Sequence, residues 1–417
     1  MRSGIISSGT ELTTGQTVDT NSSWIAARLT QLGASPLEHR TVGDDEPSFI
    51  QAIREMWSRL DLIVITGGLG PTTDDLTREA IGEALGRPLR LDEGALAEVE
   101  AYFGRMKRLM PDSNRKQAMI PEGAEHVTNP RGTAPGVHVT DGSRHLFALP
   151  GVPSEMKVMF PAVEHVLRSR APDAGSALRY LRCFGMPEAK VSDALGELMD
   201  RNRNPLVGTT ASRWVITVRI LAQGRTAEEA VQLAEADAGL VRERLGDVVF
   251  GEGNATLEES VAVALSASQA TLATAESCTG GLMAKRLTDI PGSSRWFREG
   301  FVTYANEAKT ARLGVSEALL AEHGAVSAPV AEAMAAGAAR QAGTDYAIST
   351  TGVAGPSGGT PAKPVGLVFI GLSSPDGVMS RRFTWGDHFS RDEIRDAACK
   401  TALNMLRMRL SSRGEVA

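Results

Sequence analysis

The sequence has few cysteine and aromatic residues and no long hydrophobic run, and each of these shortages excludes a class of protein. Its three cysteines, at positions 183, 278 and 399, are too widely spaced for a disulfide framework or a paired-cysteine zinc site. No stretch of 18 apolar residues occurs, so no transmembrane helix is predicted, and the first residues show no apolar run of signal-peptide length. We therefore expect a cytoplasmic protein without a membrane partner.

An excess of positive charge is also missing. The chain has 44 basic and 50 acidic residues, a formal net charge of −6, which does not favour a nucleic-acid partner. Its hydrophobic content of 42% and charged content of 23% are those of a globular protein. A length of 417 residues suggests two to four domains.

The first block, residues 1–170, alternates short apolar runs with helix-like stretches. The runs at 4–6 and 62–65 predict strands, and one helix is predicted to begin at Asn21, as its N-cap, because Ile25, Leu29 and Leu32 then share a face. This alternation is typical of βαβ units on a largely parallel sheet, which places ligand loops at the carboxyl ends of strands. An α/β fold is the prediction.

Two further blocks follow a stretch at 171–176 that has the composition of a linker. Residues 171–252 predict a small α+β domain, KH-like or ferredoxin-like, with the order strand, helix, strand, strand, helix, strand. It has no G-x-x-G loop with which to clamp a nucleic acid. Residues 253–417 return to α/β alternation, and the alanine-rich run Ala328–Ala342 predicts a packed helix.

A glycine-rich loop is the clearest feature of the first block. The strand at 62–66 leads into GGLGPTTDD at 67–75, where Gly67, Gly68 and Gly70 can turn backbone N–H groups toward an anion. The carboxylates of Asp74 and Asp75 suit a hard divalent cation. The alternative is a plain glycine turn in which an Asp caps the next helix.

The third block contains hydroxyl, phenol and amine groups suited to nucleophilic catalysis. Ser277 and Ser294 lie in small-residue turns, and YANEAK at 304–309 joins a strand to a helix that Asn306 should cap. A serine needs a base, and Lys309 beside Tyr304 can act as one if burial lowers its pKa. Each of these residues could instead have a purely structural role: Ser277 as a helix cap, Ser294 in a turn, Tyr304 in the core and Lys309 on the surface. Cys278 is expected to be a buried thiol rather than a nucleophile.

The motifs of the first block resemble one known family. GTEL at 9–12, TNS at 20–22, GGLGPTTDD, GTAPG at 132–136 and ALPGVPSEM at 148–156 look like the molybdopterin-binding (MoCF) domain at the front of CinA proteins. The resemblance implies a pyrophosphatase for ADP-ribose that uses a divalent metal cation (Mg, Co, Mn or Ni). It implies that Asp74, Asp75 and Glu11 form the metal and phosphate side of the site, with Glu155 as a further candidate. Substrate contacts are implied for Asn21, Lys116 and the loop glycines. Thr10 stands where many relatives carry an Asp.

The motifs of the third block resemble the CinA C-terminal domain. They are ESCTGG, PGSS, YxNxxK, GAVS at 324–327, TGVAGPSGGT and KPVG at 363–366. The resemblance implies a nicotinamide mononucleotide (NMN) deamidase without a cofactor, and a homodimer. Ser294 is preferred to Ser277 as nucleophile, since Ser277 suits phosphate binding at a helix start, with Tyr304 and Lys309 as base and proton relay. The implied ligand contacts are Ser277, Thr279, Gly280, Thr351, Gly352, Gly355 and Arg391.

Two rival hypotheses remain open. The first block would be a carrier that only binds a pterin or nucleotide, or the chain would act through protein partners in DNA uptake or damage response. The leading hypothesis is a bifunctional hydrolase of pyridine-nucleotide metabolites, acting on NMN and ADP-ribose.

Overall fold

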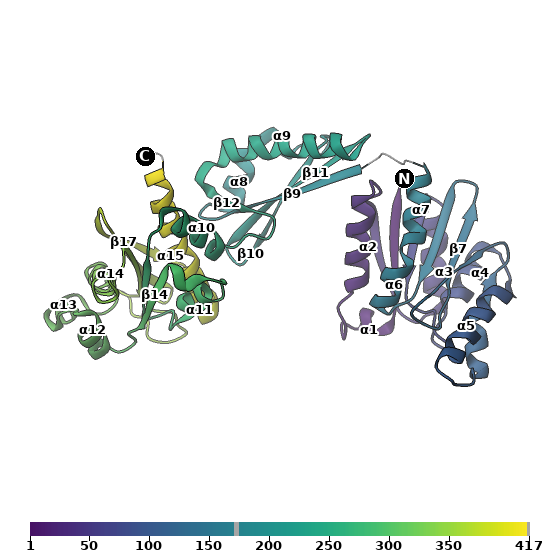
Figure 1. The fold of residues 1–417 in the computed structure, drawn as a ribbon, viewed down its shortest axis with the longest axis horizontal. Coiled ribbons are helices and arrows are strands. Elements are labelled where there is room, and N and C mark those ends of the chain that lie inside the picture. Colours follow the sequence, from purple (N-terminus) through teal and green to yellow (C-terminus); the bar gives the residue numbers. More distant parts are fainter. Residues whose placement is uncertain (171–174, 415–417) are drawn as a thin grey trace. The chain divides into compact units, whose positions relative to one another are not determined.

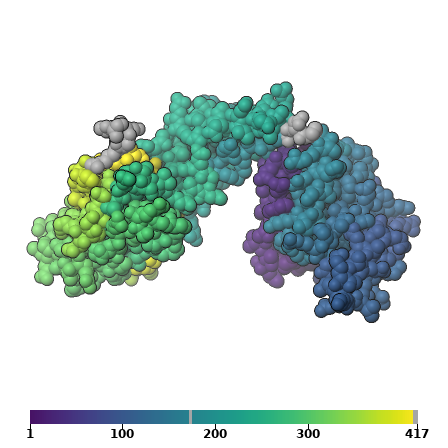
Figure 2. Space-filling view, in the orientation of Figure 1, coloured from purple at the N-terminus to yellow at the C-terminus, as the bar shows by residue number. Residues whose placement is uncertain are grey.

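The computed structural model describes residues 1–170 and 175–414 (Figure 1). Contacts divide the chain into one unit of Met1–Leu178 with Leu221–Ala234 and a second of Arg179–Ile220 with Glu235–Ala417. Most of the predicted linker, residues 171–174, lies outside the described residues, whereas Gly175 and Ser176 begin a strand. In space-filling form the first block runs from purple to blue and the third from green to yellow (Figure 2).

The first block is built on a six-stranded sheet with the order β2-β1-β3-β8-β7-β6. Strands β2, β1, β3 and β8 are parallel, while β7 and β6 are antiparallel to their neighbours. The prediction of a largely parallel sheet is confirmed. The bounds are β1 Ser3–Ser8, β2 Pro36–Val42, β3 Leu62–Thr66, β6 Glu125–Val127, β7 Gly136–Asp141 and β8 Arg144–Leu149, beside a two-stranded sheet of β4 Leu89–Leu91 and β5 Met119–Pro121.

The sheet has a hydrophobic core on each of its two faces. Ile63 and Ile65 pack with α3 and α4, whereas Leu62 and Val64 pack with α2, α6 and α7, because successive side chains point to opposite faces. All five residues of β3 are buried, as expected of a strand covered on both sides. The helices are α1 Thr10–Thr13, α2 Thr20–Gln31, α3 Glu46–Trp57, α4 Thr77–Leu85, α5 Glu93–Arg105, η1 Asp112–Ala118, α6 Pro153–Met159 and α7 Pro161–Arg170.

The N-cap of helix α2 is Asp19, two residues before the predicted cap at Asn21. The Asp19 carboxylate accepts a hydrogen bond from the Ser22 backbone N–H at 2.9 Å. An Asp at this position satisfies a free N–H group of the first turn and complements the helix dipole. The Asn21 side chain is therefore available for contacts with the sheet.

The middle segment forms a four-stranded sheet with the order β10-β11-β9-β12. Its elements follow the predicted order along the chain. Between β10 and β11 the turn residues Arg213 and Trp214 both have positive φ values, 44° and 71°. The bounds are β9 Gly175–Cys183, α8 Glu188–Leu195, η2 Gly196–Met199, β10 Leu206–Ser212, β11 Val215–Gly224, α9 Ala227–Leu245, η3 Gly246–Val248 and β12 Val249–Glu252.

The third block has a five-stranded sheet with the order β14-β13-β15-β16-β17. Strands β14, β13 and β15 are parallel, and β16 and β17 continue antiparallel. The bounds are α10 Leu257–Ser268, β13 Leu272–Glu276, α11 Leu282–Thr288, η4 Ser293–Arg295, β14 Phe297–Val302, α12 Asn306–Leu313, α13 Glu317–His323, α14 Ala328–Ala342, β15 Tyr346–Gly352, β16 Leu367–Ser374, β17 Gly377–Thr384 and α15 Arg391–Gly414.

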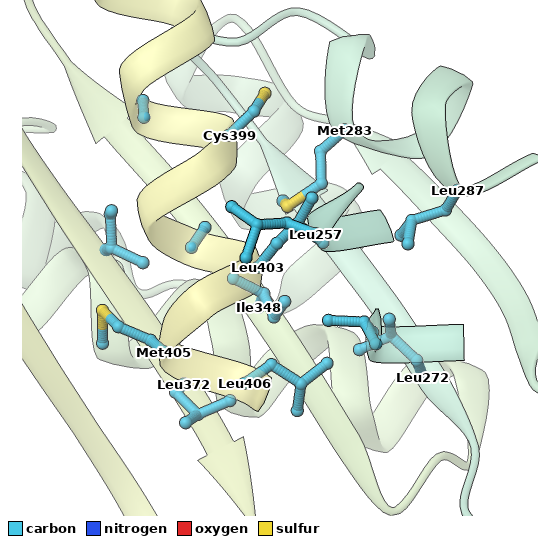
Figure 3. Close-up of a cluster of buried hydrophobic side chains, with 14 of the residues drawn as sticks. Leu257, Leu272, Met283, Leu287, Ile348, Leu372, Cys399, Leu403, Met405 and Leu406 are labelled. Carbon is cyan, nitrogen blue, oxygen red and sulfur yellow. The ribbon is translucent and has the colours of Figure 1, made fainter. Parts of the chain in front are cut away.

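Helices cover both faces of this sheet. Figure 3 shows side chains of α15, among them Leu403 and Leu406, gathered with Leu257 of α10 and Leu272 of β13. On the other face the strand alanines pack with α14, whose observed bounds are those predicted. None of the described helices has the length and apolar character needed to cross a membrane.

Candidate active site

Three parallel strands of the third block bring their carboxyl ends to one edge of the sheet. Strand β13 lies between β14 and β15, so the turns that follow these strands become neighbours. Two backbone hydrogen bonds join the turns directly: Ser277 N–H donates to the Thr350 carbonyl and Thr303 N–H donates to the Glu276 carbonyl, each at 2.9 Å. The predicted motifs after these strands therefore meet in space.

A cavity of about 190 Å³ lies at this edge. Its wall combines hydroxyl, amine and guanidinium groups with small side chains, a mixture suited to a polar ligand. The lining residues are Ser277, Cys278, Tyr304, Asn306, Lys309, Ala325, Val326, Thr351, Gly352, Ala354 and Arg391.

Lys309 is the buried cationic group of this cavity. It is the fourth residue of α12, whose N-cap is Ala305, so the predicted cap at Asn306 is wrong by one residue. Helical side chains tilt toward the helix N-terminus, and this one reaches back to the strand ends. Its Nζ lies 3.2 Å from Ser277 Oγ, 2.9 Å from the Thr303 carbonyl and 3.1 Å from the Tyr304 carbonyl.

Burial lowers the pKa of the Lys309 amine below its ordinary value, because the charged form loses hydration; the residue is only 1% exposed. Negative charge on Cys278, and to a smaller extent on Glu307, would raise this pKa, but burial is the larger effect. Burial also raises the pKa of the neighbouring Cys278 thiol to about 12, so the thiol is protonated at neutral pH. The amine thus has no anionic thiolate beside it to hold its proton.

Ser277 and Ser294, the two candidate nucleophiles, occupy different environments. Ser277 is partly buried and contacts Lys309 Nζ. Ser294 lies in the exposed turn η4 and is not among the residues that line the cavity; its carbonyl accepts a hydrogen bond from Arg298 at 3.3 Å. The geometry places Ser277, and not Ser294, against the lysine amine, while the assignment of Ser294 as nucleophile stays a prediction of the resemblance.

Tyr304 also differs from the predicted proton relay. Its carbonyl, not its phenol, contacts Lys309. The residue is 62% exposed, and its hydroxyl accepts a hydrogen bond from Arg391 Nη2 at 3.0 Å. Arg391 Nη1 donates to the Gly355 carbonyl at 2.8 Å. Tyr304 and Arg391 thus form the mouth of the cavity, and the Tyr304 phenol does not contact the lysine amine.

The other predicted ligand residues fall into two groups. Thr351 and Gly352 line the cavity, and Thr351 Oγ1 donates to the Ala325 carbonyl at 2.7 Å. Thr279 and Gly280 are not among the lining residues: the Thr279 hydroxyl is fully buried against the Thr350 hydroxyl at 2.7 Å, and Gly280 is an exposed turn residue. Thr279 therefore contacts the strand end next to the cavity and not the cavity itself.

Glu276 is a supporting residue that the sequence reasoning overlooked. Its fully buried carboxylate accepts hydrogen bonds from the backbone N–H groups of Met283 at 3.0 Å and Ala284 at 2.7 Å. These residues lie in the first turn of α11, whose N-cap Gly281 has no side chain to offer. The missed signal was a carboxylate at a strand end, shortly before a helix that has no capping residue.

We expect Glu276→Ala to lower the free energy of unfolding by about 2 kcal/mol, since two backbone N–H groups lose their acceptor. Urea denaturation of the full chain measures this change. Glu276→Gln is the matched control, because its amide oxygen can still accept one of the bonds. Equal midpoints for Glu276→Ala and the wild type would contradict the capping role.

The first block has a cavity of its own, of about 170 Å³, where β1 and β3 end. Glu11, Asn21 and Gly67 line it. The Asn21 amide donates to Thr66 Oγ1 at 3.0 Å and to the Gly151 carbonyl at 2.8 Å. Gly67 has a φ of 105°, and a Cβ there would meet the Ser8 carbonyl oxygen at 2.4 Å, so the turn requires glycine.

The predicted metal ligands of this block are not brought together. The Asp75 carboxylate folds over Gly70 and accepts a hydrogen bond from the Thr72 N–H at 2.8 Å. Asp74 is exposed, and a hydrogen bond from Thr72 lowers the pKa of its carboxyl. Neither residue lines the cavity that contains Glu11. Across residues 1–170 and 175–414, no group of three His, Cys, Asp or Glu residues is placed to hold a metal ion. Metal ligation by Asp74, Asp75 and Glu11 stays a prediction of the resemblance.

Lys116 and Glu155 have structural partners in this block. Lys116 Nζ donates to the carbonyls of Thr72 at 3.1 Å and Asp75 at 2.7 Å and forms an ion pair with Glu79. Gly68 and Gly70 lie in the same loop, outside the lining of the cavity. Glu155 Oε2 accepts a hydrogen bond from the Asn129 amide at 2.7 Å. These contacts shape the glycine loops.

Three family models match consecutive parts of the chain. They are the probable molybdopterin binding domain at residues 4–169, the damage-inducible protein CinA KH domain at 178–251 and the CinA C-terminal domain at 254–410. A CinA-like protein of Geobacter metallireducens is 45% identical over 99% of this chain and 100% of its own length. The chain belongs to the CinA family.

Other CinA relatives agree with this assignment. A putative competence-damage inducible protein of Symbiobacterium thermophilum is 43% identical over 96% of both chains. Among solved structures, a competence/damage inducible protein from Agrobacterium tumefaciens is 43% identical, covers 37% of this chain and 93% of its own, and has a TM-score of 0.36. These names identify a family and do not state a reaction.

Proposed function

We propose that the third block hydrolyses the carboxamide of nicotinamide mononucleotide to the acid and ammonia, with Ser277 as nucleophile and Lys309 as base. The observation that carries the proposal is the 3.2 Å contact between Ser277 Oγ and a buried amine whose pKa is lowered. A hydroxyl attacks an amide only when a neighbouring group takes its proton. The neutral form of a buried lysine is suited to that role.

Lys309 Nζ donates to three oxygens, those of the Ser277 hydroxyl and of the Thr303 and Tyr304 carbonyls. When the amine loses a proton, its two remaining N–H bonds can stay on the carbonyls, which leaves the lone pair to accept from the Ser277 hydroxyl. The two carbonyls thereby hold the lone pair toward the nucleophile. This arrangement does the work that a carboxylate does for histidine in other serine hydrolases.

The proposed reaction has two halves. Ser277 Oγ bonds to the amide carbon as its proton passes to Lys309, and the C–N bond then breaks as Lys309 returns the proton to the leaving ammonia. Water next attacks the acyl-serine, with Lys309 again as base, and releases the acid and free Ser277. We assign stabilisation of the oxyanion to backbone N–H groups of the turn that follows Ser277.

The cavity fits one end of the substrate. Its volume of about 190 Å³ is below the roughly 300 Å³ of pockets that enclose a whole ligand. We therefore place the nicotinamide ring inside, with the ribose phosphate at the mouth beside Arg391. An arginine can bind a phosphate through two N–H groups.

Ammonia release from NMN in the presence of EDTA tests the proposal. We expect turnover to persist, since serine and lysine supply both the nucleophile and the base. Nicotinamide riboside, which lacks the phosphate, is the matched control substrate and should react with a higher KM. No ammonia from NMN at any pH between 6 and 10 would refute the assignment.

The first block does not support a second proposal of equal strength. Glu11 and Asp19 line its cavity, and its lining residues include no Lys or Arg to receive a pyrophosphate. Asp74 and Asp75 do not line the cavity that contains Glu11, and we derive no step through a metal ion. Cleavage of ADP-ribose and the homodimer stay predictions of the resemblance.

A further inference from the structure

The turn between β10 and β11 is held in an unfavourable backbone conformation. Arg213 and Trp214 both adopt positive φ, 44° and 71°, where residues with a Cβ are strained. A two-residue turn between neighbouring strands favours positive φ at both positions, although Asn and Gly are the residues preferred there. The turn thus carries two large side chains where small ones are usual, and the contacts of both residues lie on the third block.

Aromatic and ionic contacts hold this turn against the third block. The Trp214 ring lies 4.6 Å from the ring of Phe389 and 6.4 Å from that of Trp385, centroid to centroid. Lys400 Nζ donates to the Arg213 carbonyl at 2.7 Å. Aromatic pairs at such distances are more favourable than their buried area alone suggests.

The segment that Trp214 contacts leads directly into the candidate active site. Phe389 is followed by Ser390, which caps α15 through reciprocal hydrogen bonds with Glu393, and then by Arg391. Arg391 holds the Gly355 carbonyl and the Tyr304 hydroxyl at the cavity mouth. One residue therefore separates the ring that packs on Trp214 from the guanidinium at the mouth.

We propose that Trp214 is a positioning residue for the deamidase site: by packing on Phe389 it fixes the start of α15 and so the direction of the Arg391 guanidinium. This inference rests on the proposed function, in which Arg391 receives the substrate phosphate. It assigns the middle domain a role in substrate affinity although none of its residues lines the cavity. Trp214 touches no reacting atom, so its removal affects binding rather than chemistry.

The test measures KM and kcat for NMN, together with the calorimetric Kd of NMN, on the full chain. Trp214→Ala should raise KM and Kd about tenfold and leave kcat within about twofold, the pattern of a lost binding interaction. Trp214→Phe, which keeps an aromatic contact, should recover most of the affinity and also covers the case in which the alanine variant fails to fold. The matched control is Trp24→Ala, which removes a partly buried tryptophan that packs on Phe160 in the first block; its KM should equal that of the wild type.

A double-mutant cycle with Arg391→Ala separates positioning from general destabilisation. If Trp214 acts through Arg391, the KM effect of Trp214→Ala should nearly disappear in the Arg391→Ala background. The proposal would be overturned if the KM increases of the two single variants multiply in the double variant, or if Trp214→Ala leaves KM unchanged. If the wild type binds NMN with an affinity that depends on Trp214 but releases no ammonia, the deamidase proposal is refuted and the positioning role is supported. If the wild type does not bind NMN, both are refuted.

Discussion

Ser277→Ala should lower the kcat for ammonia release from NMN by about 10⁴-fold or more, the scale of losses seen when a serine nucleophile is removed. The reason is geometric: Ser277 Oγ is the hydroxyl that contacts the buried amine of Lys309. The alanine variant should still bind NMN, because the groups proposed to hold the phosphate and the ring are unchanged. A stopped assay for ammonia and calorimetry with NMN measure the two quantities.

Ser294→Ala is the matched control for this experiment. It makes the same change on a serine that lies in an exposed turn outside the cavity lining. We expect its kcat to stay within about twofold of the wild type, as for most surface substitutions. The reverse result, full activity in Ser277→Ala and loss in Ser294→Ala, would restore the choice that the family resemblance favoured.

Lys309→Met should lower kcat/KM by about 10³-fold or more, since it removes the proposed general base while preserving much of the buried volume. Lys309→Arg should be almost equally inactive, because a guanidinium stays charged at every accessible pH and cannot accept the serine proton. Ammonia release measured for both variants beside the wild type tests this prediction. Activity in Lys309→Met above about one tenth of the wild type would exclude the amine as the base.

The pH profile of the wild type gives an independent measurement of the same base. Burial lowers the pKa of Lys309, so its neutral, active form accumulates at a lower pH than for an exposed lysine. The value of kcat/KM should therefore rise with pH and level off before pH reaches the ordinary lysine value of about 10.4. The residual activity of Lys309→Met should lack this rise; a rise that persisted in the variant would have to come from another group.

The alternation of strands and helices was readable from the sequence because it depends on local patterns. Apolar runs of strand length and the periodicity of helices such as Ala328–Ala342 are properties of neighbouring residues. The largely parallel sheet followed from that alternation. Helix caps were placed less well, at Asn21 and Asn306, because adjacent polar residues compete for the same backbone N–H groups.

Several residues that line the cavity of the third block were singled out from the sequence, but their contacts with one another were not. Motifs after separate strands could be expected to converge, since parallel strands end at the same edge of a sheet. Which serine meets Lys309 depends on the strand order β14-β13-β15, and no local pattern encodes that order. The direction of the Tyr304 phenol, toward Arg391 and away from the amine, depends on the same arrangement.

The glycine loop of the first block shows a similar limit. The acidic residues after GGLG had the spacing of a metal site, yet the Asp75 carboxylate hydrogen-bonds within its own loop. Carboxylates close in sequence often satisfy nearby backbone N–H groups, and this local use competes with metal binding. Sequence proximity alone could not separate the two.

By itself, the sequence determined the α/β class, the succession of blocks and the group of residues that carry the proposed chemistry, because hydrophobic periodicity, turn composition and motif content are local. The tertiary structure alone decided that Ser277 faces Lys309, that Ser294 does not line the cavity and that the turn at Trp214 packs beside the helix carrying Arg391. The physical reason is that a lysine loses its hydration, and with it part of its basicity, only when strands distant in sequence close around it.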